Sequence, residues 1–307
     1  MGWKAISRSE VGTSHRQENI PCQDYGDYRL FGDVIVGVVA DGAGSAKYSH
    51  VGSELAVNTV IDLFARNFHK SEQKKLSPPS PEEKTKQMFT KIVQEVIAQI
   101  GKKAKQNNCD IQDLACTLLI FIATPEWLVA MQIGDGLMVV RPQNSPDYQL
   151  LFNPHKGEFV NETTFVTCSH ALEEMQVKVI PSPEFIAAAT DGLENVAITL
   201  KNCQPFPGFF QPLETYLQST TDPNQEDEYL VNFLQSEALN KRTSDDKTVL
   251  LSIWQSSEVV LPPLIPPSQG GNNKIQSSPR GCLPEIFTLV NPLVRGWLGW
   301  GNTKYPH

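Results

Sequence analysis

The sequence predicts a mixed fold of the α+β class, in one domain that ends near residue 255. Short β-branched apolar runs, such as residues 34–40, are typical of buried strands. Two longer segments, residues 51–68 and 83–105, repeat apolar residues at helical spacing and predict amphipathic helices. After residue 256 the composition changes to one rich in proline and glycine, as in linkers.

The strands follow one another at short intervals, and Pro125 lies in a turn that pairs two of them as a hairpin. We expect strands at residues 3–9, 34–40, 117–123, 127–133, 137–141, 185–190 and 248–254. Residues 142–184 contain several prolines, and we expect an irregular segment there, a mobile flap that helps to select substrates. A further helix is expected between Asp222, which can cap it, and Arg242.

Composition excludes several classes of function. The chain has 307 residues, a hydrophobic fraction of 40% and a formal net charge of −8, so it can build a substantial core. No basic stripe is present, which argues against nucleic acid as a partner. The six cysteines are dispersed and form no C-x-x-C pair, which argues against a zinc site or a disulfide framework. The first residues lack the apolar stretch of a signal peptide and no run of about 18 apolar residues occurs, so we expect a cytoplasmic protein without a membrane span.

Aspartates recur where apolar strands end. Asp41 and Asp191 each directly follow a predicted strand, and Asp135 lies in a Gly-Asp-Gly turn between two strands. Asp24 precedes a further strand expected around Leu30, and Asp245 precedes the strand expected at residues 248–254. Each such residue alone is typical of a turn, but together they can converge on one end of a sheet. Carboxylates that share a site repel one another unless cations lie between them, and oxygen ligands favour Mg²⁺ or Mn²⁺.

The ordered motifs CQD, ADGAGS, QIGDG, ATDGLENV and SDDKTVLL resemble those of the PP2C family of metal-dependent protein serine/threonine phosphatases. The resemblance covers about residues 12–254. The segments GTSH…IPCQD and GEFVNETTF are similar to a bacterial branch of that family. The resemblance implies a four-layer α-β-β-α sandwich and a water-dependent hydrolysis of phosphoserine and phosphothreonine that needs no covalent enzyme intermediate.

It also implies the roles of individual residues. Two Mn²⁺ or Mg²⁺ ions, with a weaker third, would be held by Asp24, Asp41, the Gly42 carbonyl, Asp135, Asp191 and Asp245. Asp41 would bridge both ions, Asp24 would hold metal-bound water, and Asp135 would serve the third ion. Either His15 or Arg16 would bind phosphate, because the arginine spacing of the family is stretched here.

The sequence departs from the family at two further positions. Ala43 stands where animal members often have a histidine proton donor, and Gln23 replaces a usual glutamate. Asp245 is preferred over Asp246 as the metal ligand because it lies three residues before Thr248, which resembles the D-N-x-T form of the family. Asp246 is then a capping or turn residue.

Two other functions remain open. One is a catalytically weak module of the same fold that binds or senses phosphoproteins. The other is a regulatory interaction protein that acts mainly through its C-terminal end. We divide the chain into a phosphatase domain (residues 1–255), a linker (256–282) and an apolar, aromatic tail (283–307). We expect the tail to dock on its own domain, on a partner or on a membrane surface.

Overall fold

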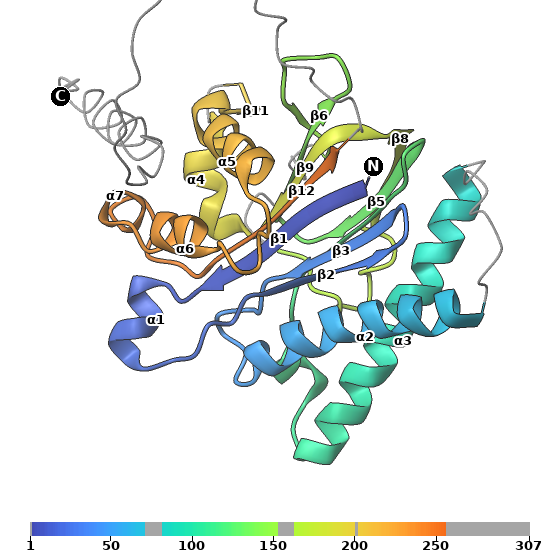
Figure 1. The fold of residues 1–307 in the computed structure, drawn as a ribbon. Helices are drawn as coiled ribbons and strands as arrows, with labels where there is room; N and C mark the ends of the chain where they lie inside the picture. The colour runs from blue at the N-terminus through green and yellow to red at the C-terminus, as the bar shows by residue number, and fades with distance from the viewer. Residues whose placement is uncertain (1, 71–81, 153–162, 200–201, 256–307) are drawn as a thin grey trace, which may run out of the picture. The chain divides into compact units, whose positions relative to one another are not determined.

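Two five-stranded antiparallel sheets form the centre of the fold (Figure 1). The computed structural model describes residues 2–70, 82–152, 163–199 and 202–255. The first sheet has the order β1 (Gly2–Glu10), β12 (Lys247–Gln255), β9 (Pro183–Ala189), β6 (Leu137–Pro142), β7 (Gln149–Leu150). The second has the order β2 (Tyr25–Phe31), β3 (Val34–Ala40), β4 (Leu118–Ala123), β5 (Trp127–Ile133), β8 (Gln176–Pro181).

The inner faces of the two sheets pack against each other. Phe121 from β4 is fully buried in this layer, and its ring lies where a Cβ at position 37 would come within 2.3 Å. Only glycine at position 37 therefore leaves room for the Phe121 ring. The layer also contains apolar residues from six other strands, among them Ala5, Ile35, Leu128, Met138, Ile186 and Leu250.

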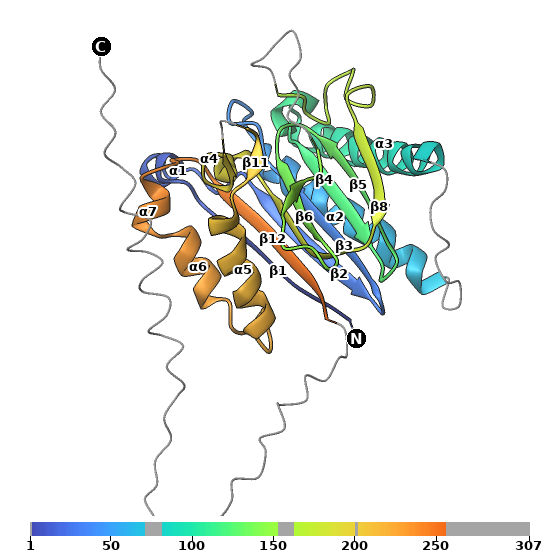
Figure 2. The same cartoon turned by 90° about the horizontal axis from the view of Figure 1, so that it is seen from above.

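Helices cover both outer faces, as Figure 2 shows. Helices α2 (Ser49–Lys70) and α3 (Glu82–Asn107) bury apolar residues against the second sheet. Helix α5 (Pro207–Ser219) lies against the first sheet, with Phe209, Phe210, Leu213 and Leu217 buried. The resulting order of layers is helix, sheet, sheet, helix, which confirms the predicted sandwich.

Short elements connect these layers. They are α1 (Thr13–Glu18), η1 (Ile111–Leu114), η2 (Asp191–Leu193), α4 (Glu194–Ala197), the pair β10 (Ile198–Thr199) and β11 (Gln204–Pro205), α6 (Glu228–Leu234) and α7 (Glu237–Asn240). The expected strands and the two long helices are present, each within a few residues of its expected bounds.

The prediction that residues 142–184 are wholly irregular is wrong. This stretch contains β7, β8 and the beginning of β9. β8 escaped prediction because it is an edge strand, paired only with β5, and its buried Val177 alternates with polar Gln176 and Lys178. Residues 153–162 lie outside the described part of the chain.

The single helix expected between Asp222 and Arg242 is also a wrong prediction. Asp222 caps a turn, accepting a hydrogen bond from Asn224 N at 3.1 Å, and two short helices follow. The break comes at Ser236, whose hydroxyl oxygen caps α7 by accepting from Leu239 N. Helices α1 and α5 were not predicted.

No helix in the described ranges is both long enough and apolar enough to cross a membrane. The expected linker and tail, residues 256–307, lie outside the described residues.

Candidate metal centre

The antiparallel pairing brings five segments to one end of the two sheets. In the second sheet Tyr25, which begins β2, pairs with Ala40, which ends β3. In the first sheet Ala189, which ends β9, pairs with Leu137 at the start of β6 and with Val249 near the start of β12. The five aspartates predicted from the sequence lie in the connections at this end: Asp24, Asp41, Asp135, Asp191 and Asp245.

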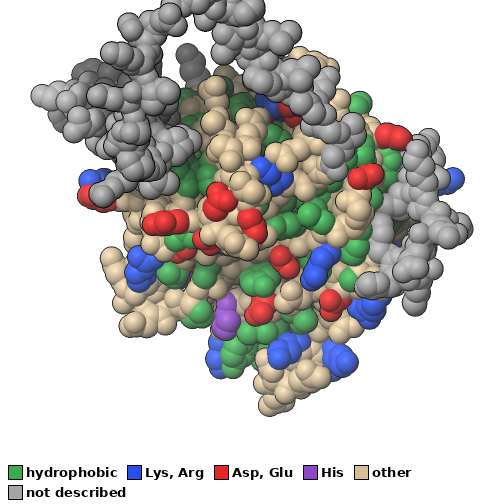
Figure 3. Space-filling model, in the orientation of Figure 1, with side chains coloured by type: hydrophobic (Ala, Val, Ile, Leu, Met, Phe, Trp, Pro, Cys, Tyr) green, Lys and Arg blue, Asp and Glu red, His purple; other side chains and the backbone are tan. Residues whose placement is uncertain are grey.

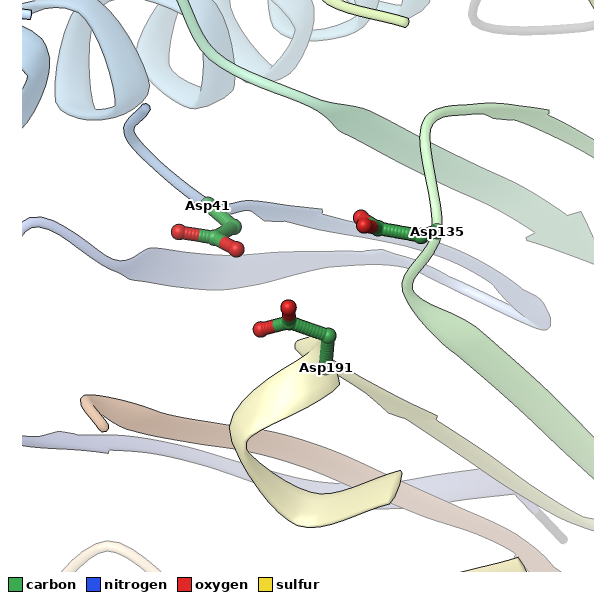
Figure 4. Close-up of side chains that lie close together, drawn as sticks. All are labelled: Asp41, Asp135 and Asp191. Carbon is green, nitrogen blue, oxygen red and sulfur yellow. The ribbon is translucent and has the colours of Figure 1, made fainter. Parts of the chain in front are cut away.

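Three of these side chains form a cluster. Asp41, Asp135 and Asp191 each place a carboxylate oxygen within 4.8 Å of the others, which is the spacing of groups that share a metal ion. Figure 4 shows their carboxylates directed toward a common space from three separate connections. Asp135 is exposed, whereas Asp41 and Asp191 are partly buried.

Burial and mutual repulsion raise the pKa values of the buried members. The pKa of Asp41 is raised strongly, first by burial and then by the charges of Asp24 and Asp191. Burial also raises the pKa of Asp24 to about 7 and that of Asp191 to about 6. Asp245 and Asp135 add to the negative field at Asp191. A divalent cation would relieve this repulsion, and the all-oxygen donor set fits Mg²⁺ or Mn²⁺.

Threonines fix Asp24 and Asp41. Thr190 Oγ1 donates to Asp24 Oδ2 at 2.7 Å, and Asp24 is only 4% exposed. The Thr117 hydroxyl accepts from Asp41 N at 2.9 Å, and Thr117 N donates to Asp41 O at 2.8 Å. Neither threonine was predicted as a site residue, although Thr190 directly precedes Asp191 in the ATDGLENV motif.

Gly42 occupies a place where no side chain fits. A Cβ there would lie 2.7 Å from Gln23 O and 2.8 Å from Ser49. Its N–H donates to Gln23 O at 3.1 Å, so the residue after Asp41 is tied to the residue before Asp24. This contact holds the two aspartate-bearing connections together.

Asp245 and Asp246 face different surroundings. Asp246 is 2% exposed and accepts hydrogen bonds from Gly12 N at 2.6 Å and Gln23 N at 2.5 Å. Asp245 is exposed and adds its charge to the field at Asp191. Asp246 is therefore held by backbone donors, and the choice of Asp245 as the metal ligand stays a prediction.

The two candidate phosphate-binding residues lie on α1. His15 Nδ1 contacts Asp246 Oδ2 at 3.0 Å, and its side chain is 16% exposed. Arg16 is exposed and donates to Val11 O at 3.4 Å. His15 is therefore held by a buried carboxylate, whereas Arg16 is the more accessible cation.

The space-filling view shows acidic side chains spread across the middle of one face, with Lys and Arg side chains between and below them (Figure 3). On this face the described residues form no continuous basic stripe, in agreement with the acidic net charge of −8.

Solved bacterial phosphatases share this fold. The serine/threonine phosphatase Stp1 from Staphylococcus aureus superposes with a TM-score of 0.56 at 14% identity, over 83% of this chain and 96% of that one. The S. agalactiae serine/threonine phosphatase gives a TM-score of 0.53 at 16% identity, over 82% of this chain and all of the other, 100%. The sandwich of this chain is thus the fold of these bacterial serine/threonine phosphatases.

Sequence comparison then gives the family. The sequence model of the family described as protein phosphatase 2C matches residues 11–235. The chain is 31% identical over 262 residues to serine/threonine-protein phosphatase 3 of Escherichia coli (strain K12), covering 83% of this chain and 99% of that protein. The chain belongs to the protein phosphatase 2C family, whose members are metal-dependent hydrolases.

Proposed function

We propose that this protein phosphatase hydrolyses phosphoserine and phosphothreonine in proteins, with two Mn²⁺ or Mg²⁺ ions and a weaker third held at the aspartate end of the sheets. The observation that carries the proposal is the cluster of Asp41, Asp135 and Asp191, with oxygens within 4.8 Å of one another. Such crowding of carboxylates is costly unless cations lie among them.

The ligand roles follow from position. Asp41 lies between Asp24 and Asp191, whose charges both act on it, and so suits the bridging role. We assign Asp191 and Asp245, with the Gly42 carbonyl, to the inner set of ligands, and Asp24, which accepts from Thr190, to the outer one. Asp135, the exposed member, suits a weaker third ion.

Bound divalent cations would supply charge neutralisation at the phosphoryl oxygens and an activated water for in-line attack. Other residues of the chain hold these side chains in position. Thr117 fixes Asp41, Thr190 fixes Asp24, and Asp246 fixes His15. His15 or Arg16 would neutralise the phosphate. Arg16 suits bidentate contact with phosphate, whereas His15 is already oriented by Asp246.

The test compares a phosphothreonine peptide with a phosphotyrosine peptide, with Mn²⁺ and with excess EDTA. We expect release of phosphate from phosphothreonine only with metal.

Asp41→Asn should lower kcat by at least about 10²-fold, because a misplaced reacting geometry costs about that much. The matched control is Asp62→Asn on the exposed side of α2, which should keep full activity. Full activity in EDTA, or a folded and active Asp41→Asn protein, would refute the mechanism.

The alternative of a catalytically weak binding module is not favoured, because aspartates occupy all five positions at this end of the sheets. A module without catalysis would bind the phosphopeptide with Mn²⁺ yet release no phosphate.

Two finer proposals rest on the sequence alone: a cytoplasmic location, and docking of the tail on its own domain or on a partner. Truncation after residue 256 tests the second. Docking on its own domain predicts a lower melting temperature of the truncated chain, and docking on a partner predicts an unchanged one.

A further inference from the structure

One aspartate of the cluster has a partner outside the five aspartate-bearing motifs. Thr163 Oγ1 donates a hydrogen bond to Asp135 Oδ2 at 2.5 Å. Asp135 is exposed in the turn between β5 and β6, so its side chain has few neighbours to restrict it. Thr163 belongs to the NETTF sequence, in the stretch that the sequence analysis assigned to a flap.

The segment that begins at Thr163 is fixed to the body of the domain. Val166 N donates to Cys116 O at 2.8 Å, and Val166 is fully buried. Thr167 and Gln112 exchange two hydrogen bonds: Thr167 Oγ1 donates to Gln112 Oε1 at 2.8 Å, and Gln112 Nε2 donates to Thr167 O at 2.9 Å. Thr163 is thus presented to Asp135 from an anchored backbone.

The same anchor supports Asp41. Cys116, which holds Val166, directly precedes Thr117, which hydrogen-bonds to Asp41. Gly134, with φ of 104°, lies so close to Thr117 that a Cβ would come within 2.5 Å of its side chain and 3.3 Å of Thr164 O. The turn that carries Asp135 is therefore packed between the support of Asp41 and the segment that carries Thr163.

We propose that Thr163 is a positioning residue that orients the Asp135 carboxylate for a divalent cation and so couples the segment of residues 163–175 to metal binding. The inference rests on the proposed role of Asp135 as a metal ligand. The hydroxyl engages Oδ2 and does not occupy Oδ1. Hydrogen bonds of this kind to metal-ligating groups commonly affect metal affinity by about 10–100-fold.

The experiment measures Mn²⁺ binding to the whole chain, from the electron paramagnetic resonance signal of free Mn²⁺. Thr163→Val removes the hydroxyl with little change in shape, Thr163→Ser keeps it, and Thr164→Val makes the same change at the next residue. For the weakest site we expect about 10-fold lower affinity in Thr163→Val. Thr163→Ser and Thr164→Val should stay within about twofold of the parent.

A second readout tests the coupling without activity. If the segment and the metal act on the same carboxylate, then metal binding must stabilise the segment, because linkage is reciprocal. Mn²⁺ should slow amide hydrogen exchange at residues 163–175 in the parent chain and in Thr163→Ser, but not in Thr163→Val.

The failures of the two proposals are distinguishable. If Asp135→Asn leaves Mn²⁺ binding unchanged, Asp135 is not a ligand and the proposed site itself is wrong at that position. If Asp135→Asn weakens binding but Thr163→Val binds Mn²⁺ as well as or better than the parent, only the positioning role is overturned. Equal losses in Thr163→Val and Thr164→Val would mean a general packing effect and would also overturn it.

Discussion

Asp245 and Asp246, adjacent in the motif SDDKTVLL, have different roles. Asp246 is buried and joins Gly12 N, Gln23 N and the His15 ring to the start of β12. The backbone is closely packed on both sides of this point: a Cβ on Gly12 would lie 2.4 Å from the Asp245 carbonyl carbon, and one on Gly192 would lie 1.9 Å from Asp246 O. Asp245 itself is exposed.

We expect Asp246→Ala to lower the free energy of unfolding of the metal-free chain by about 3 kcal/mol, because two buried N–H groups lose a charged acceptor. Urea unfolding in EDTA measures this value. Asp245→Ala is the matched control: it should leave that stability within about 0.5 kcal/mol, since its side chain is exposed, yet weaken Mn²⁺ binding. Equal stability of the two variants would show that Asp246 does not hold these segments together.

The sequence could predict the types and order of the acidic residues, because each follows or precedes an apolar strand and antiparallel strands bring such ends together. It could not predict the threonines that hold them. The side chains of Thr117, Thr163 and Thr190 each make one hydrogen bond to an aspartate across 28 to 166 positions of sequence separation, and nothing in their local sequence differs from a threonine in a strand or loop.

A buried ionic network joins the helical layer to the first sheet. Arg141 at the end of β6 donates to both carboxylate oxygens of Glu214 in α5. Tyr148 OH donates to Glu214 Oε2 at 2.6 Å, and Arg141 also reaches Glu184 at 2.9 Å. The Arg141 and Glu214 side chains are only 13% and 6% exposed, so each depends on the other for compensation of its charge.

We expect Glu214→Ala to lower the free energy of unfolding by about 3 kcal/mol, since it leaves a buried guanidinium and a buried tyrosine hydroxyl without their main acceptor. The matched control is Glu237→Ala, which breaks the exposed Glu237–Lys241 pair of α7, with side chains 84% and 68% exposed. That change should cost less than about 0.5 kcal/mol. A Glu214→Ala protein as stable as the control would mean that Glu184 alone compensates Arg141.

Elements with a strong apolar pattern were predictable, and those held by long-range contacts were not. β3 matches its expected bounds, because all but one of its residues are buried and six of its seven are apolar side chains. Helix α5 begins at Pro207, has a second proline inside it, and is stabilised by Phe209 and Phe210 against a sheet far away in sequence. The two prolines argue against a helix at the level of sequence, so α5 could not be predicted; tertiary packing stabilises it.

At the scale of the whole molecule, the fold concentrates negative charge at one end of two sheets. The two-sheet arrangement places the connections after β3, β5 and β9 together with those before β2 and β12. Without cations, folding therefore brings together carboxylates that are far apart in the unfolded chain. The stability of the metal-free protein must then depend on pH.

The raised pKa values decide whether the stability of the metal-free protein rises or falls with pH. Burial raises the pKa of Asp191 to about 6 and that of Asp24 to about 7, against about 4 in the unfolded chain. Between these limits the folded state binds more protons than the unfolded state, so stability is present at low pH and falls as pH rises. Asp41, whose pKa is raised most, adds to the same trend.

We expect the melting temperature in EDTA to fall between pH 5 and pH 8. A loss of about 2 kcal/mol would lower it by about 4–8 °C for a domain of this size. Saturating Mn²⁺ should remove the fall, because ligand carboxylates then stay ionised at no cost in repulsion. Asp41→Asn in EDTA should show a shallower fall, since one member of the crowded set is then permanently neutral. Differential scanning calorimetry across this range decides the matter: a melting temperature that is flat or rises with pH in EDTA would mean that the aspartates are not crowded in the metal-free protein.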